Sequence, residues 1–212
     1  MTTDFREERL AMVQRQLVSR GVRDPGVLSA MRTVPRHEFV PDDLKDLAYD
    51  DRPLPIGRGQ TISQPYIVAL MTELAELRGE ESVLEVGTGS GYQAAVLAEL
   101  AARVYTIELV EPLLRQAAET LARLRYRNVF PRFGDGRLGW KEMAPFDAIL
   151  VTAAPSRRVP AELLAQLCEG GRLVVPVGGE VQTLRLLRRR GGSFEERDVM
   201  AVRFVPLVGA AE

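Results

Sequence analysis

The sequence predicts an α/β protein whose core is a mostly parallel β-sheet covered by helices. Two observations support this fold class. After residue 64, short apolar segments alternate with helical patterns of roughly 10–15 residues, as expected for consecutive βαβ units. A glycine-rich loop follows the first apolar segment, at the position where an open parallel sheet binds its ligands.

The N-terminal part of the chain has a different pattern. Residues 4–20 have the hydrophobic spacing of an amphipathic helix, and Gly21 marks its end. A short second helix is expected after Asp24-Pro25, which combines an N-cap with a proline in the first turn. Residues 35–64 are rich in proline and glycine. We expect them to form a long ordered loop, and loops of this length are uncommon unless they are functional.

The pattern also predicts the remaining elements and the limits of the core. A glycine pair, Gly191-Gly192, predicts an antiparallel hairpin of 183–190 and 194–205 added to the sheet. We expect 65–212 to form the α/β core and 1–64 to pack on it as a helical appendage, within a single domain. The expected strands are 82–86, 103–108, 129–133, 146–151 and 173–177, the expected helices are 65–77, 93–101, 112–125 and 160–168, and a turn is expected at 169–171.

Composition excludes several classes of function. The chain has 28 basic and 29 acidic residues, a balance that argues against a nucleic-acid partner. Cys168 is the single cysteine and His37 the single histidine, so no intrachain disulfide and no metal site are expected. The first residues lack the apolar core of a signal peptide, and no apolar run approaches the roughly 20 residues that cross a bilayer. We therefore expect a cytoplasmic protein without membrane contact.

The glycine loop gives the strongest local signal for a ligand. Gly87, Gly89 and Gly91 form a GxGxG pattern, whereas dinucleotide sites use GxGxxG, so a nicotinamide dehydrogenase is disfavoured. Glu85 lies in the strand just before the loop and would repel a pyrophosphate. It suits a ligand with a cationic ammonium group, such as S-adenosylmethionine. A glycine-rich turn without any ligand is the simpler alternative.

Two further acids follow the next two strands. Glu108 ends the second strand, where a carboxylate can accept hydrogen bonds from ribose hydroxyls. Asp135 follows the third strand and can accept from an adenine amino group. Taken singly, Glu108 can be a helix-terminus charge and Asp135 a turn residue. Together with Glu85 they place three acids at successive strand ends, and this constellation favours a nucleoside cofactor.

The segment 57–65 contains a candidate active-site hydroxyl. Ser63 stands two residues before Pro65, which by itself favours a helix cap. No His or Cys lies nearby in sequence to build a nucleophilic triad, so an acylated serine is not expected. A hydroxyl that orients a substrate carboxylate is the functional alternative.

Several stretches resemble the protein-L-isoaspartate O-methyltransferase family. The glycine loop is shared by most methyltransferases of this fold, whereas 60–65 is much more specific to this family. The resemblance covers nearly the whole chain in order, and the matching stretches are 36–41, 54–66, 83–92, 134–137, 146–154, 169–178 and 202–207.

The resemblance implies a Rossmann-like, S-adenosylmethionine-dependent methyltransferase with a seven-stranded, mostly parallel sheet, helices on both faces and a variant order of the final strands. It makes Ser63 the active-site serine. The positions it assigns to cofactor binding are Ile56, Gly57, Gly59, Gln60, Thr61, Glu85, Gly87, Thr88, Gly89, Gly91, Glu108, Asp135 and Gly136. The positions it assigns to substrate binding are Ile62, Pro65, Ala154, Val205, Pro206 and Leu207.

The family function follows as an expectation. Methyl transfer from S-adenosylmethionine to the free α-carboxylate of L-isoaspartyl residues in damaged proteins would start their repair, with S-adenosylhomocysteine as the second product and a monomer as the working form. An acceptor that is another carboxylate or a small molecule remains the alternative. An RNA or amine methyltransferase would carry Asn or Asp before prolines after the fourth strand, whereas 152–155 reads Thr-Ala-Ala-Pro. A cofactor-binding sensor is disfavoured because 61–63 is retained.

Overall fold

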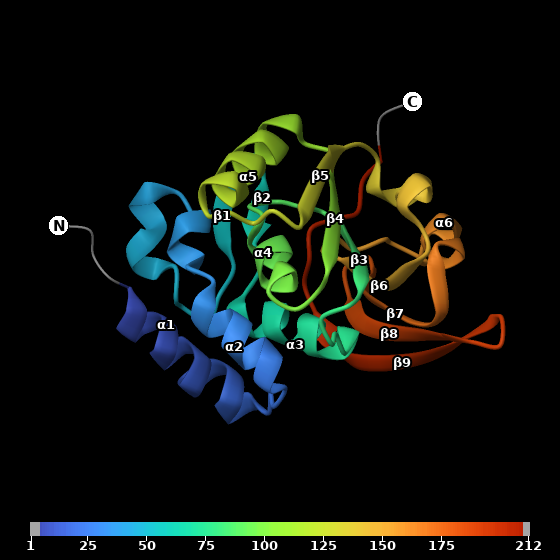
Figure 1. The fold of residues 1–212 in the computed structure, drawn as a ribbon, viewed down its shortest axis with the longest axis horizontal. Helices are drawn as coiled ribbons and strands as arrows, with labels where there is room; N and C mark the ends of the chain where they lie inside the picture. The colour runs from blue at the N-terminus through green and yellow to red at the C-terminus, as the bar shows by residue number, and fades with distance from the viewer. Residues whose placement is uncertain (1–4, 210–212) are drawn as a thin grey trace.

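The computed structural model describes residues 5–209. Its main feature is a seven-stranded sheet with the strand order β5-β4-β3-β6-β7-β8-β9 (Figure 1). The first five strands in this order are parallel, and β8 and β9 are antiparallel to their neighbours. The strands are β3 (Ser82–Val86), β4 (Arg103–Glu108), β5 (Val129–Phe133), β6 (Phe146–Val151), β7 (Leu167–Gly178), β8 (Gln182–Arg190) and β9 (Ser193–Val202). The predicted fold class and the C-terminal hairpin are confirmed.

Side chains of the parallel strands alternate between two apolar layers. Val83 and Val104 contribute to a cluster on one face of the sheet, and Leu84 and Tyr105 to a cluster on the other. The first face is covered by α3 (Pro65–Ala75), α4 (Tyr92–Ala98) and α5 (Glu111–Arg123), and α2 (Pro25–Thr33) packs on α3 and α4. The second face carries α6 (Ala161–Ala165) near the short helices η5 (Gly136–Leu138) and η6 (Lys141–Met143). Helices on both faces are thus confirmed.

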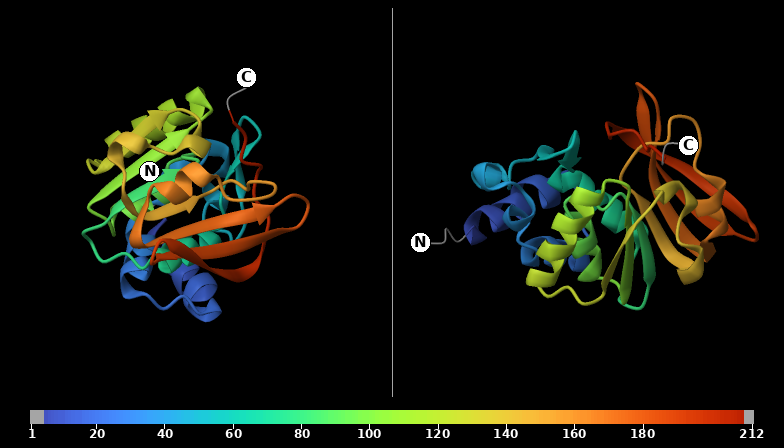
Figure 2. Two further views of the ribbon diagram at one scale, coloured as in Figure 1. Left: turned by 90° about the vertical axis from the view of Figure 1, so that its right-hand side faces the viewer. Right: turned by 90° about the horizontal axis from the view of Figure 1, so that it is seen from above.

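The N-terminal helices lie at the opposite end of the molecule from the β8–β9 hairpin (Figures 1 and 2). Helix α1 (Arg6–Met12) continues through a π-helical turn, η1 (Val13–Leu17), and a 3₁₀ turn, η2 (Val18–Arg20). It ends at Gly21, whose φ of +93° suits glycine. Helix α2 begins as expected, since the Asp24 carboxylate accepts a hydrogen bond from the Val27 N–H at 2.9 Å.

The prediction of a loop without secondary structure at 35–64 was wrong. This stretch contains the 3₁₀ helices η3 (Arg36–Phe39) and η4 (Asp42–Leu47), followed by a two-stranded antiparallel sheet of β1 (Leu54–Gly57) and β2 (Gln60–Ile62). A tight turn joins the two strands because Gly57, Arg58 and Gly59 all adopt positive φ. Strand β2 then ends directly before Ser63.

The boundaries predicted around residue 168 were also wrong. Helix α6 ends at Ala165, and β7 already begins at Leu167, so Cys168 lies in a strand. Residues 169–171 are an irregularity inside β7, because Leu167 pairs with Phe146 while Arg172 pairs with Ala148. Glu169 turns toward the β8–β9 hairpin, where its carboxylate accepts a 2.5 Å hydrogen bond from the Gly191 N–H.

Within residues 5–209, no helix is both long enough and apolar enough to cross a bilayer. In the same part of the chain, no three His, Cys, Asp or Glu residues come close enough to hold a metal ion.

Leu17 offers a test of whether the N-terminal helices and the sheet unfold as one unit. Its side chain is fully buried in the cluster that also contains Val83, whereas Leu10 in α1 is 42% exposed. We expect Leu17→Ala to lower the free energy of unfolding by about 3 kcal/mol, because it leaves a cavity, and Leu10→Ala to change it by less than about 0.5 kcal/mol. Urea denaturation followed by circular dichroism measures both. A separate early transition in Leu17→Ala would contradict a single cooperative unit.

Candidate active site

The glycine loop leaves β3 in a conformation that only glycine accepts. Gly87 has a φ of +98°, and a Cβ atom there would lie 2.4 Å from the Thr152 hydroxyl oxygen. Thr152 follows β6, and its hydroxyl donates to the Gly87 carbonyl at 2.7 Å. The ends of β3 and β6 therefore hold the start of the loop from two sides.

The loop is also tied to β4 through Glu108. One carboxylate oxygen of Glu108 accepts a hydrogen bond from the Gly89 N–H at 2.8 Å. The other accepts from the N–H groups of Leu109 and Val110, both at 2.9 Å. A carboxylate has about four acceptor positions, so Glu108 retains capacity for a further donor such as a ribose hydroxyl. Its predicted place at the end of the second core strand is confirmed.

Glu85 is completely buried at the end of β3. Its Oε2 atom accepts a 2.5 Å hydrogen bond from the Thr106 hydroxyl on β4. The Thr88 and Thr106 hydroxyl oxygens lie 2.6 Å apart and share a further hydrogen bond. The Oε1 atom of Glu85 is buried without a hydrogen-bond partner among the described residues. An orphaned buried carboxylate oxygen is costly, and a cationic ligand would satisfy it.

Burial raises the pKa of Glu85 to about 8, and the nearby Glu108 carboxylate adds to the rise, while the Thr106 hydrogen bond opposes it. A strongly shifted acid that lines a cavity marks a candidate functional site.

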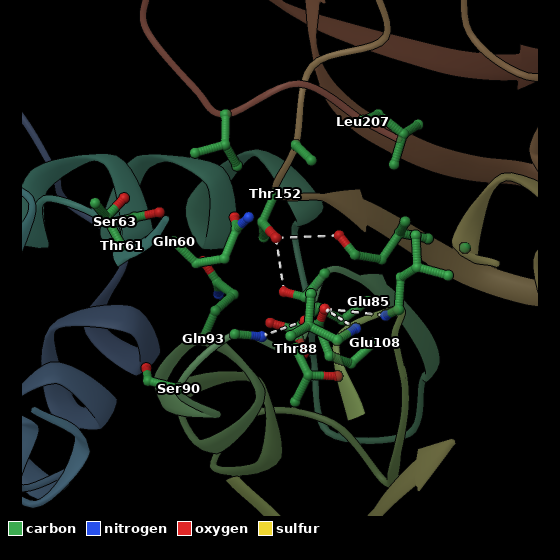
Figure 3. Close-up of a pocket in the computed structure, with 18 of the residues that line it drawn as sticks. Gln60, Thr61, Ser63, Glu85, Thr88, Ser90, Gln93, Glu108, Thr152 and Leu207 are labelled. Carbon is green, nitrogen blue, oxygen red and sulfur yellow. Dashed lines mark hydrogen bonds between the residues drawn. The ribbon is translucent and has the colours of Figure 1, made fainter. Parts of the chain in front are cut away.

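These groups line one cavity of about 820 Å³, part of which is open to solvent (Figure 3). It lies at the carboxyl ends of β3 and β4, between the glycine loop, the Ser63 segment and the C-terminal stretch after β9. Such an edge is where parallel sheets bind ligands. Of the residues proposed from the sequence, those that line it are Gln60, Thr61, Ile62, Ser63, Glu85, Gly87, Thr88, Gly89, Glu108, Gly136, Val205, Pro206 and Leu207.

The position of Ser63 argues against the helix-cap interpretation. Helix α3 begins at Pro65, its N-cap position is Gln64, and no side chain caps it. Within residues 5–209 the Ser63 hydroxyl makes no hydrogen bond, whereas the Gln64 amide donates to the Asp51 carbonyl at 3.0 Å. The hydroxyl is therefore available to a ligand, and its backbone is anchored by the next residue.

Ser63 also lines a second cavity, which we call the outer groove. This groove encloses about 1020 Å³, open solvent included, between Pro53, Ile67 and the 200–205 stretch at the end of β9. The residues that line both cavities are Thr61, Ser63, Thr152 and Val205. The Ser63 segment thus stands at the junction of an inner, acid-lined cavity and an outer groove.

The C-terminal stretch is fixed against the end of β6. The Ala154 N–H donates to the Val205 carbonyl, and the Leu207 N–H donates to the Ala154 carbonyl, both at 2.8 Å. Ala154 and Pro206 form a parallel bridge. The proposed substrate positions Ala154, Val205, Pro206 and Leu207 are therefore brought together, although 154 and 205 are far apart in sequence.

Some proposed residues lie beside the inner cavity rather than on its lining. The Asp135 carboxylate accepts from the Arg137 N–H at 2.9 Å and pairs with its guanidinium at 2.7 Å. Ile56 packs near Gly89, in the small cleft next to the glycine loop. The others that do not line the inner cavity are Gly57, Gly59, Gly91, Pro65 and Ala154. They lie in the β1–β2 turn, in the glycine loop, at the start of α3 and after β6.

The sequence analysis missed several lining or supporting groups. Thr106 is a buried polar residue inside the apolar strand β4, and that contrast was a usable signal. Ser90 and Gln93 follow the loop, and the Gln93 amide donates to the Thr72 hydroxyl at 2.9 Å. Thr152 comes directly after β6 but only its contact with Gly87 reveals its role.

The chain was compared with known families and proteins. The family model described as protein-L-isoaspartate(D-aspartate) O-methyltransferase matches residues 7–212. Among curated proteins, the protein-L-isoaspartate O-methyltransferase of Opitutus terrae is 60% identical over 201 residues, covering 94% of this chain and 86% of that protein. The enzyme of that name from Picosynechococcus is 57% identical over 201 residues, covering 95% of this chain and 90% of that protein.

Solved structures agree with this result. A structure named protein-L-isoaspartate O-methyltransferase superimposes with a TM-score of 0.85 at 30% identity, covering 96% of this chain and 66% of that chain. A second structure, from Plasmodium falciparum and in complex with S-adenosyl-L-homocysteine, has a TM-score of 0.83 at 26% identity. The match covers 94% of this chain and 98% of that chain. The match of the family model over nearly the whole chain, together with these relatives, shows that the chain belongs to the protein-L-isoaspartate(D-aspartate) O-methyltransferase family.

Proposed function

We propose that the chain transfers a methyl group from S-adenosylmethionine to the free α-carboxylate of L-isoaspartyl residues in damaged proteins and peptides. The relatives carry this activity in their names, and one neighbour holds S-adenosyl-L-homocysteine. The observation that carries the proposal is the free Ser63 hydroxyl at the junction between the inner cavity and the outer groove.

The inner cavity fits S-adenosylmethionine on its own chemistry. The orphaned Oε1 atom of Glu85 suits the ammonium group of the methionine part. Glu108 has acceptor capacity for the ribose hydroxyls, and the Gly87–Gly89 stretch permits close approach of the backbone. No Lys or Arg lines this cavity among the described residues, as suits a ligand without phosphate. When bound, S-adenosylmethionine supplies an electrophilic methyl group attached to a sulfonium.

The residues of the chain then position the acceptor rather than activate it. An α-carboxylate is ionised at neutral pH, so the reaction needs no general base. Ser63 donates a hydrogen bond to this carboxylate and fixes which oxygen faces the inner cavity. Alignment and exclusion of water supply most of the rate in such a reaction. The methoxy group of the ester leaves far more readily than an oxygen of the free carboxylate. The backbone amide nitrogen of the next residue therefore attacks the ester carbonyl, methanol is released and a succinimide forms. Water reopens this ring, and part of the product is the normal aspartyl linkage.

The remaining parts of the proposal concern the protein as a whole. We propose that it works as a monomer in the cytoplasm, without nucleic acid, on isoaspartyl proteins. The balanced charge of 28 basic and 29 acidic residues supports the absence of a nucleic-acid partner.

A matched peptide pair tests the proposed reaction. One peptide carries L-isoaspartate and the other normal L-aspartate at the same position, each incubated with methyl-labelled S-adenosylmethionine. We expect base-labile label on the isoaspartyl peptide alone. Equal labelling of both peptides would point to a general carboxylate acceptor, and labelling of neither would remove the proposed substrate.

Substitution of Ser63 separates its role from cofactor binding. We expect Ser63→Ala to lower kcat for the isoaspartyl peptide by roughly 10–100-fold, because the acceptor carboxylate loses its fixed orientation. The dissociation constant for S-adenosylhomocysteine should change less than about twofold, as measured by calorimetry. Ser193→Ala, at the exposed start of β9, is the matched control. An equal loss of turnover and cofactor affinity would argue for a structural role instead.

The raised pKa of Glu85 predicts pH-dependent cofactor binding. The free protein holds a proton on Glu85 below its pKa of about 8, whereas a cationic ligand favours the carboxylate. Binding should therefore release a proton near pH 7, and affinity for S-adenosylhomocysteine should increase from pH 6 to pH 8. Calorimetry in two buffers of different ionisation enthalpy measures the number of protons released on binding. Glu85→Gln should weaken binding about 10–100-fold and release none. Wild-type binding without proton release would contradict the assignment.

A further inference from the structure

The lining of the outer groove carries positive charge and no negative charge among the described residues. Among the described residues that line it, Arg203 is the one with a charged side chain, and the others are apolar or neutral. Arg203 is exposed and follows the last residue of β9, Val202. A cation in an otherwise uncharged groove gives the groove a preference for one sign of ligand charge.

The guanidinium of Arg203 is not used by the protein itself. It has no hydrogen bond and no ion pair within residues 5–209. The arginines of the neighbouring strand β8 are different, since each lies near an acid. These pairs are Arg185 with Asp198 at 2.9 Å, Arg188 with Glu76 at 2.5 Å, Arg189 with Glu169 at 3.8 Å and Arg190 with Glu195 at 3.4 Å. Arg203 therefore differs from the arginines that stabilise the hairpin.

The backbone around Arg203 is held in place at Phe204 and at the Val205 carbonyl, which accepts from the Ala154 N–H. The Gln182 side chain accepts from the Phe204 N–H at 2.6 Å and donates to the Phe204 carbonyl at 3.0 Å. The N–H groups of Arg203 and Val205 have no hydrogen-bond partner in the described part of the chain. The stretch 203–205 is thus a fixed edge with unused donors, along which an extended peptide can lie.

The position of Arg203 sets its distance from the reacting group. Val205 lines both cavities together with Ser63, and Arg203 precedes it by two residues. In an extended chain two residues span about 7 Å and place both side chains on the same side. A peptide that runs along this edge, with its isoaspartyl carboxylate at Ser63, brings a residue about two positions away to Arg203.

We propose that Arg203 forms a subsite for an acidic side chain two residues from the isoaspartyl residue. The enzyme then favours damaged sites in acidic sequence surroundings over those in basic ones. This inference rests on the proposed function, because it names the sequence context in which the isoaspartyl group is recognised. Since the pair is exposed to solvent, its contribution is modest and falls with salt.

The test uses isoaspartyl peptides that differ in one residue. Glu, Gln or Lys is placed two residues before the isoaspartyl residue in one series and two residues after it in another. In one of the series we expect the KM of wild-type enzyme to be about fivefold lower for Glu than for Gln and about fivefold higher for Lys, the upper range for an exposed charge pair. The difference should shrink at 0.5 M salt.

Variants assign the preference to Arg203. In the series that shows the ranking, Arg203→Gln should bring the three KM values together, and Arg203→Glu should reverse their order. Arg197→Gln, which removes an exposed arginine of β9 outside the groove, should keep the wild-type ranking. A ranking that survives Arg203→Gln, or equal KM values in both series of the wild type, overturns the subsite while leaving the proposed function intact. Failure to methylate any isoaspartyl peptide overturns both.

Discussion

The hydrogen-bond chain from Thr88 through Thr106 to Glu85 connects the features of the inner cavity. It holds a buried carboxyl at the end of β3 with one oxygen satisfied and the other left for a ligand. Desolvation raises the pKa of this carboxyl to about 8. The glycine loop that follows can approach a ligand because Glu108 and Thr152 fix its backbone from both sides.

Catalysis by this chain is mainly a matter of placement. The acceptor carboxylate needs no base, so the useful work is to bring it to the inner cavity in one orientation. Three distant parts of the chain meet at this cavity: the Ser63 segment, the glycine loop, and the C-terminal stretch paired with Ala154. The Ser63 segment is flanked by the β1–β2 hairpin on one side and by the hydrogen bond of Gln64 to the Asp51 carbonyl on the other.

The antiparallel hairpin links the sheet to substrate recognition. Its strands add to β7, and its arginines are paired with acids, so the hairpin itself is electrostatically satisfied. Gln182 on β8 then fixes Phe204, and the chain leaves β9 along the mouth of the outer groove. An unpaired Arg203 on this fixed edge is therefore placed to distinguish substrates by charge, independently of the methyl-transfer chemistry.

Local patterns in the sequence determined the α/β class, the bounds of β3, β4, β5 and β6, and the acids at the strand ends, because hydrophobic periodicity and glycine spacing act within a few residues. Tertiary structure decided what depends on distant contacts. Ser63 in the sequence resembled a helix cap, and only its place at the junction of two cavities frees its hydroxyl. The irregularity in β7 depends on its register with β6. The site forms where Glu85, Thr152 and Val205 meet, because the sheet brings together strand ends that are far apart in the sequence.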